Sequence, residues 1–208
     1  MVLCPSLAAM PSSATDQDAV IAATRHWLAR AVIGLNLCPF AKSVYVKEQV
    51  RYVVCDATEA PDLLDVLERE LKLLAETDPA QVDTTLMIMP DAVADFLDFN
   101  DLLFFAERLL KSLRLEGMLQ IASFHPRYQF EGAEPDDIEN YTNRSPYPIL
   151  HLLREDSIAR AAAAFPDAAD IYERNMETMR RLGHEGWQRW MEGDDAGDDS
   201  AAPRAADA

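Results

Sequence analysis

The chain has 208 residues, of which 49% are hydrophobic and 26% are charged, the composition of an ordinary globular protein that can bury one core. Its 36 acidic and 19 basic residues give a net charge of -17, and so acidic a surface repels phosphate backbones, which excludes nucleic acid as an expected partner. No run of about 18 apolar residues is present, so no membrane span is predicted.

The two ends of the chain differ in composition from its middle. Residues 1–14 hold Pro, Ser and Ala without periodicity, and residues 192–208 are acidic and poor in apolar side chains, so both are predicted to be disordered. Residues 15–191 are predicted to form a single domain. The start of the chain has no basic segment typical of a secretory signal, and the odd number of cysteines fits reduced thiols. We therefore expect a cytoplasmic protein.

The first predicted element is a helix that is capped by Thr15 and ends near Gly34. Between these two residues, apolar side chains recur at helical spacing. Pro39 then turns the chain. Four segments are rich in β-branched and apolar residues over the length of a strand: 50–56, 84–89, 118–124 and 149–153.

Helical patterns separate these predicted strands. One helix is expected to begin at Thr58, with leucines at positions 63, 67, 71 and 74 on one face, and a second to run from Pro90 to about Gly117. Two more are expected near the C-terminus, over 157–165 and from Asp167 to a C-terminal Gly183. The two tryptophans after Gly183 either fold back onto the core or form a short amphipathic end.

This order of elements predicts an α/β domain. The first three strands are separated by helical segments of about 15–20 residues, which is typical of crossover connections between parallel strands. We expect a single domain with a mixed sheet of about four strands and helices packed over it. An α+β ferredoxin-like sandwich is the alternative.

Common cofactor motifs are missing from the sequence. None of its seven glycines occurs in a GxGxxG or P-loop pattern, so no NAD or ATP motif is present. There is no CxxC, no HExxH and no histidine pair at i, i+4. The cofactor therefore stays unknown, and a metal site would have to be assembled from distant residues.

The segment from Ser123 to Arg154 carries most of the residues with usable chemistry. His125 follows a predicted strand and precedes Pro126, which places it at the carboxyl end of that strand, where open α/β sheets bind ligands. A histidine there can transfer protons near neutral pH, so His125 is a candidate acid/base. The alternative is a histidine that is hydrogen-bonded to a loop carbonyl.

Further along this segment lies a cluster of candidate ligand-binding residues. Arg144 sits in a proline-stiffened stretch beside Ser145, and its guanidinium suits the capture of a carboxylate or phosphate. Asp136, Asn140 and Asn143 are predicted to lie roughly on one face of a helical turn, where their side chains could orient a ligand. The competing interpretation is a loop whose polar side chains satisfy its own backbone.

Cys38 is the second catalytic candidate. It precedes Pro39 at a helix boundary, and Lys42 lies four residues on, where a cation lowers a thiol pKa. With His125 as its base, Cys38 would be a nucleophile. A buried and inert thiol is the alternative, and Cys55 on its strand is predicted to be core.

His151 and Arg154 are predicted to have structural roles. On a strand, His151 shares a face with Ile149 and Leu153, which favours a core histidine whose hydrogen bonds are satisfied. Arg154 precedes Glu155 and Asp156, which favours a surface ion pair of little energetic value.

Four segments are distinctive in combination: LNLCPFAK, LDFNDLL, LQIASFHPRYQF and DDIENYTNRSPYPILHLLRE. Together they resemble the bacterial family catalogued as domain of unknown function number 1415. The resemblance covers roughly Trp27 to Leu182, and the motif that contains NRSPYP is its specific part. It implies a cytoplasmic bacterial protein and supplies no activity, so the functional hypotheses rest on the residues.

Three hypotheses follow from these residues. In the first, a pocket gathers His125, the segment 136–145 and Cys38 with Lys42, and binds a small anionic metabolite for hydrolysis or group transfer. In the second, the 123–154 loop is the recognition surface of a non-catalytic interaction module. In the third, His125 and Asp136 form a metal site with His151 or Cys38. Neither the oligomeric state nor the reaction follows from the sequence.

Overall fold

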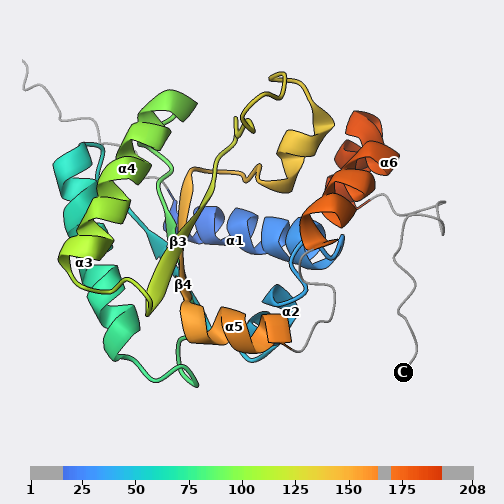
Figure 1. The fold of residues 1–208 in the computed structure, drawn as a ribbon. Helices are drawn as coiled ribbons and strands as arrows, with labels where there is room; N and C mark the ends of the chain where they lie inside the picture. The colour runs from blue at the N-terminus through green and yellow to red at the C-terminus, as the bar shows by residue number, and fades with distance from the viewer. Residues whose placement is uncertain (1–15, 164–169, 194–208) are drawn as a thin grey trace, which may run out of the picture.

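The computed structural model describes residues 16–163 and 170–193 (Figure 1). The predicted N-terminal lead, residues 1–14, and all but the first two residues of the predicted tail, 192–208, lie outside these ranges. Glu192 is the last residue of the final helix. Within the described ranges, every helix is too short or too polar to cross a lipid bilayer.

Four strands form one mixed sheet: β1 (Val50–Val54), β2 (Thr84–Ile88), β3 (Leu119–Phe124) and β4 (Ile149–Arg154). Their order in the sheet is β1-β2-β4-β3. β1 and β2 are parallel, and β4 pairs antiparallel with both β2 and β3. The predicted single α/β domain with a mixed four-stranded sheet is thus confirmed.

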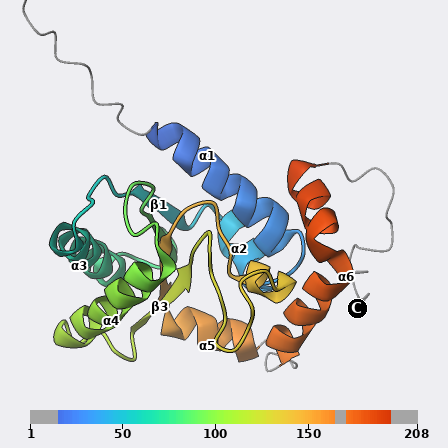
Figure 2. The same ribbon diagram turned by 90° about the horizontal axis from the view of Figure 1, so that it is seen from above.

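Helices cover both faces of the sheet (Figure 1). On one side lie α3 (Ala60–Glu76) and α4 (Phe96–Ser112). On the other lie α1 (Gln17–Trp27), its π-helical continuation η1 (Leu28–Ile33), α2 (Ala41–Val46) and α5 (Glu155–Ala163). Figure 2 shows α6 (Ile171–Glu192) beside the loop that holds the 3-10 turn η2 (Ile138–Thr142).

The larger core lies between the sheet and the α3/α4 layer. The predicted stripe of Leu63, Leu67, Leu71 and Leu74 is buried there and packs with residues of the central strands, which confirms the helical periodicity. Burial of each leucine side chain contributes about 1.5–3 kcal/mol relative to an exposed one. A second core, between the sheet and α1, is built around Trp27.

Several predicted helix ends are wrong by a few residues. The N-cap of α3 is Glu59 and not the predicted Thr58, so the helix begins at Ala60. α4 begins at Phe96 and not at Pro90, because Val93 has a positive φ of 44° and the Asp95 side chain caps the helix by accepting the Leu97 N–H at 2.9 Å.

The first and last helices also differ from the prediction. Asp16 caps α1 by accepting the N–H groups of Asp18 and Ala19, and Thr15 lies outside the described residues, as does Asp167. Gly183 does not end the last helix. Its φ of 63° kinks α6, which continues to Glu192 because Trp187 and Trp190 fold back onto the core.

Candidate functional site

His125 is fully buried directly after β3, with its ring between Phe96 and Phe99 of α4 at centroid distances of 5.3 and 5.1 Å. Nδ1 accepts the Arg127 backbone N–H at 3.0 Å, and Nε2 donates to the Val93 carbonyl at 3.0 Å. These partners fix the neutral tautomer, and burial lowers the pKa of His125. Proton transfer by this ring would break one of the two hydrogen bonds, so its geometry matches the structural interpretation.

Asn140 holds the loop after β3 together. Its side chain is fully buried, accepts the Phe130 backbone N–H at 3.0 Å and donates to the carbonyls of Glu134 and Pro135 at 2.8 and 3.3 Å. All of these partners belong to the loop itself. The side chain therefore cross-links the backbone and is not available to a ligand.

We expect Asn140→Ala to lower the free energy of unfolding by about 2–3 kcal/mol, because it removes three partly buried hydrogen bonds that hold the loop together. Urea denaturation followed by tryptophan fluorescence measures this loss. The matched control is Asn100→Ala on the exposed face of α4, where the change should stay within about 0.5 kcal/mol. Equal effects of the two substitutions would contradict the cross-linking role.

Arg144 is also engaged by its own loop. Its guanidinium donates to the carbonyls of Pro135 at 2.6 Å and Tyr128 at 3.3 Å and lies 4.3 Å from the centroid of the Tyr141 ring. An anion at this site would have to displace carbonyl partners. The geometry again matches a loop that satisfies its own backbone.

The other candidates of this segment do not converge on one concavity. The Asn143 amide donates to the Ser123 carbonyl at 3.4 Å, and the buried Ser145 hydroxyl donates to the Tyr147 carbonyl. Asp136 is exposed, and its carbonyl is hydrogen-bonded by His184. The polar side chains of this loop thus bond mainly to nearby backbone groups and do not form a shared pocket.

Cys38 and His125 lie on opposite faces of the sheet. Cys38 packs against the core around Trp27 on the α1 side, whereas the His125 ring packs on α4. The structure therefore does not assemble the predicted pair of Cys38 and His125. Burial raises the pKa of the Cys38 thiol, the opposite of the shift that Lys42 was expected to cause, and the Lys42 side chain is exposed. Cys55 is buried as predicted.

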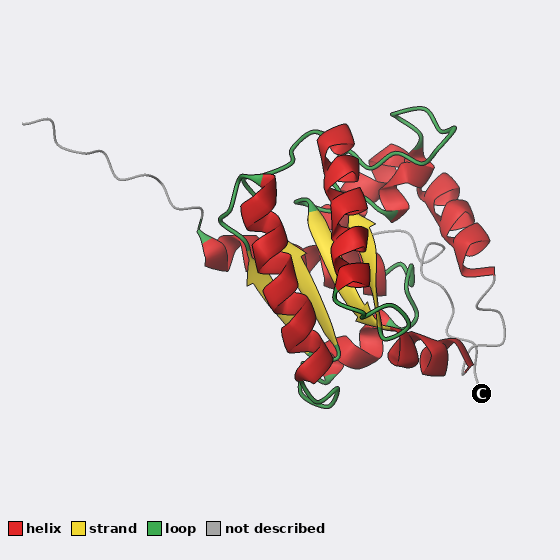
Figure 3. Cartoon of the chain, turned by 60° about the vertical axis from the view of Figure 1, so that its left-hand side comes forward, coloured by secondary structure: helices red, strands yellow, loops and turns green. Residues whose placement is uncertain are grey.

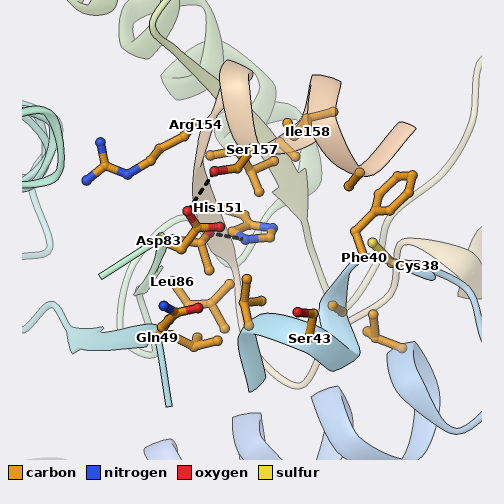
Figure 4. Close-up of a pocket in the computed structure, with 18 of the residues that line it drawn as sticks. Cys38, Phe40, Ser43, Gln49, Asp83, Leu86, His151, Arg154, Ser157 and Ile158 are labelled. Atoms are coloured by element: carbon orange, nitrogen blue, oxygen red, sulfur yellow. Dashed lines mark hydrogen bonds between the residues drawn. The ribbon is translucent and has the colours of Figure 1, made fainter. Parts of the chain in front are cut away.

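A large cavity lies on the α1 side of the sheet (Figure 4). We call it the sheet cavity. Its volume is about 680 Å³, within the range of pockets that hold small organic ligands. It is bounded by all four strands of the sheet, by the connection before β2, by α1 and η1, by α2 with the turn before it, and by α5, and it opens to solvent. Its larger apolar wall residues are Trp27, Leu28, Val32, Phe40, Leu86, Phe124, Leu153 and Ile158.

His151 is the polar centre of the sheet wall. It lies on the face of β4 predicted from the strand alternation, together with Ile149 and Leu153. Its Nε2 is 2.6 Å from the Thr84 hydroxyl, which also donates to the Leu152 carbonyl at 2.7 Å. Burial lowers the pKa of His151 to about 4, so the ring is neutral near pH 7. Within the described part of the chain, Nδ1 makes no hydrogen bond.

A short chain of polar side chains lies beside His151. The Ser157 hydroxyl donates to Asp83 at 2.6 Å (Figure 4). It also accepts from the Arg160 guanidinium at 2.9 Å. Arg154 lines the same end of the cavity, but its guanidinium points away from His151, toward the end of α3. It is buried and donates to the carbonyls of Leu74, Thr77 and Val82, so the predicted surface ion pair is wrong.

The predicted metal ligands are not brought together. His125 and His151 lie on opposite sides of the sheet, and Asp136 is exposed on the loop. Among the residues that the structure describes, no group of three or more His, Cys, Asp or Glu side chains is placed to hold a metal ion.

Sequence reasoning identified Cys38 and His151 of the cavity wall and missed most of its polar residues. Lys47, Asp83, Thr84, Ser157 and Arg160 come from separate elements, and none of them belongs to a motif. The alternation of β4 does indicate which residues share the face of His151. What it does not indicate is that α1, α2 and α5 leave space above that face.

Comparison with known proteins identifies the family of this chain. A family model described as "Protein of unknown function (DUF1415)" matches residues 19–189. No curated protein and no solved structure matches the chain. The matched range includes the whole sheet, the polar loop and every element that encloses the sheet cavity. The chain therefore belongs to the DUF1415 family.

Proposed function

We propose that this domain binds a small organic acid with an apolar body in the sheet cavity. The observation that carries the proposal is a cavity of about 680 Å³ that combines an apolar wall with cationic residues at its edge, in a protein of net charge -17. The proposed ligand is the small anion expected from the sequence, but its site is the sheet cavity and not a pocket formed by His125 and the segment 136–145.

The apolar wall supports a ligand with a hydrocarbon or aromatic body. Trp27, Phe40, Leu86 and Phe124 line the cavity from four different segments, so a ligand would contact apolar side chains on more than one side. Transfer of apolar ligand surface from water to this wall is favourable by about 25 cal/mol for each Å² buried.

Charge at the cavity supports an anionic head group. Its wall contains three cations, Lys47, Arg154 and Arg160, and one carboxylate, Asp83. The nearby charges of Asp83 and Arg154 compensate one another, whereas the side chains of Lys47 and Arg160 are exposed. A carboxylate would be attracted to these two cations.

His151 supports binding in preference to acid/base catalysis. A ring whose pKa is about 4 is a weak proton acceptor near neutral pH. It can instead offer Nδ1 to the ligand, with or without the proton, because the Thr84 hydroxyl can donate either to Nε2 or to the Leu152 carbonyl. No reaction step is therefore part of the proposal.

The test is isothermal titration calorimetry with saturated monocarboxylates from butanoate to dodecanoate and with the matching primary amides. We expect carboxylates of intermediate length to bind and their amides to bind more weakly. Ala122 pairs with His151 across the sheet and lines the cavity, so Ala122→Phe fills the space and should weaken both series at least about tenfold. Lys47→Glu and Arg160→Glu should weaken the carboxylates alone by about tenfold.

The chain offers a matched control for the charge change. Lys42 and Lys47 lie five positions apart on α2 and at its C-terminal cap, and both are exposed, but only Lys47 lines the cavity. Lys42→Glu should leave carboxylate binding unchanged. The proposal fails if no carboxylate binds, or if Ala122→Phe binds as tightly as the wild type.

We also propose that the protein works in the cytoplasm. Cys38 and Cys55 are free thiols in separate parts of the fold, which is usual in reducing compartments. The high negative charge also disfavours nucleic acid as a partner.

A further inference from the structure

The outer face of α4 exposes an unusual amount of apolar surface. Leu97, Phe104 and Phe105 are 73%, 56% and 50% exposed, and they are three of the six large hydrophobic residues that are exposed in the described part of the chain. α3 and α4 form the outermost layer on their side of the sheet (Figure 3). Half of this exposed set is thus concentrated on one helix, where a partner could bury it.

These residues form a continuous stripe with two charges in it. Leu97, Asp101, Phe104 and Arg108 follow one another at spacings of four, three and four, which aligns them along the helix. The Phe104 and Phe105 rings meet edge to face at 5.6 Å, and the Arg108 guanidinium lies 5.5 Å from the centroid of the Phe104 ring. We call these five residues the α4 stripe.

The charges of the exposed face are ordered along the helix. Asp98 and Asp101 lie in its N-terminal half, and Arg108 and Lys111 lie in its C-terminal half together with Glu107, so the net charge changes from negative to positive along the helix. When such a helix packs antiparallel against a copy of itself, the acidic half of each copy meets the basic half of the other. A two-fold axis that passes between Phe104 and Phe105 places Asp101 opposite Arg108 of the second copy.

We propose that a second copy of this chain covers the α4 stripe in an antiparallel, two-fold symmetric dimer. A symmetric dimer requires a surface that is complementary to itself, and the aromatic pair flanked by opposite charges meets that requirement. The aromatic pair provides the buried centre of the interface, and the charge pairs fix its direction. The repulsion between two acidic molecules is screened beyond about 10 Å at moderate salt.

The test is sedimentation velocity of the full chain over a range of concentrations. At about 100 μM, where an interaction of micromolar Kd is nearly saturated, we expect a species of twice 23.3 kDa. Phe104→Ser should raise the dimer Kd at least tenfold. Its exposed position predicts an unchanged thermal midpoint at low protein concentration, which shows that the variant is folded.

A charge exchange tests the direction of packing. Asp101→Arg alone and Arg108→Asp alone each place like charges opposite one another and should raise Kd about tenfold. The double variant Asp101→Arg/Arg108→Asp restores both pairs and should dimerise like the wild type. Lys42→Ser, on the exposed face of α2 across the sheet from the stripe, is the control for loss of a basic residue.

Three results would overturn the proposal. These are a wild type that stays monomeric at the highest concentration, a dimer that Phe104→Ser does not weaken, and a double variant that is as weak as the single ones. If the wild type is monomeric, the partner that covers the stripe would be a different protein and not a second copy. The stripe lies on the opposite side of the sheet from the sheet cavity, so monocarboxylate binding should be the same in all these variants, and the two proposals can fail separately.

Discussion

Replacement of Arg154 with alanine is expected to lower the free energy of unfolding by about 3–5 kcal/mol. The guanidinium donates to the carbonyls of Leu74, Thr77 and Val82, which lie at the end of α3 and in the connection to β2. Its positive charge also lies at the C-terminus of a helix, where the backbone dipoles favour a cation. Alanine would leave three carbonyls without this donor, in a region that is buried at Leu74 and partly buried at Thr77 and Val82.

The variants separate the charge of Arg154 from its geometry. Arg154→Lys keeps the charge but cannot reach all three carbonyls, so it should lose about half as much stability. The buried Nε has no hydrogen-bond partner in the described part of the chain, and the cost of burying it already reduces the net gain from the wild-type side chain.

The measurement is urea denaturation followed by tryptophan fluorescence, with Arg160→Ala as the control. Arg160 is exposed on α5, so its loss should change the free energy of unfolding by no more than about 0.5 kcal/mol. If the free energy of unfolding of Arg154→Ala is within about 1 kcal/mol of the wild-type value, the three hydrogen bonds do not stabilise the fold.

The fold could be predicted where local pattern and tertiary packing agree. The leucines of α3 recur at helical spacing and are buried at that spacing, and the four strands were found because their residues are β-branched or apolar over a strand's length. The start of α4 could not be found in this way. Pro90 and Asp95 are both acceptable helix starts, and the decision lies in the backbone of Val93.

The role of Arg154 shows why the partners of polar residues could not be predicted from their sequence neighbours. Its sequence neighbours are Glu155 and Asp156, but its hydrogen-bond partners lie 72 to 80 positions away. One signal was available: Leu150, Leu152 and Arg154 alternate on β4 and share the face that packs on α3. An arginine at the end of a buried face needs carbonyls to accept from it, and the end of a neighbouring helix supplies them.

The candidate site was predicted only in part, for a related reason. A polar segment that is rich in His, Asn and Arg is typical both of a binding loop and of a loop that is held together by its own side chains. The side chains of Asn140 and Arg144 donate hydrogen bonds to backbone carbonyls of the loop. The sheet cavity, in contrast, depends on how far α2 and α5 stand from the strands, and no residue pattern encodes that distance.

His151 is expected to make the stability of the domain depend on pH. Its pKa is about 4 in the folded chain and 6.5 in the unfolded chain. Between these values the unfolded chain binds a proton that the folded chain does not, so stability falls as the pH is lowered. The full difference corresponds to at most about 3.4 kcal/mol, at 1.36 kcal/mol for each pKa unit.

His151→Gln keeps a polar partner for Thr84 and removes the titration. We expect it to be somewhat less stable than the wild type at pH 7, and the gap should shrink or reverse between pH 6.5 and pH 4. His125, whose pKa is also lowered, is present in both proteins, so the difference between their curves reports His151 alone.

Leu153→Ala is the control for this experiment, because Leu153 lies on the same face of β4 and lines the same cavity without a titratable group. It should lower stability by the same amount at every pH, which gives a curve parallel to the wild type. If the stability of His151→Gln also changes in parallel with that of the wild type between pH 7 and pH 4, the ring is not buried in its neutral form. In that case the sheet cavity admits enough water to solvate a charge, and an apolar ligand body would gain little by entering it.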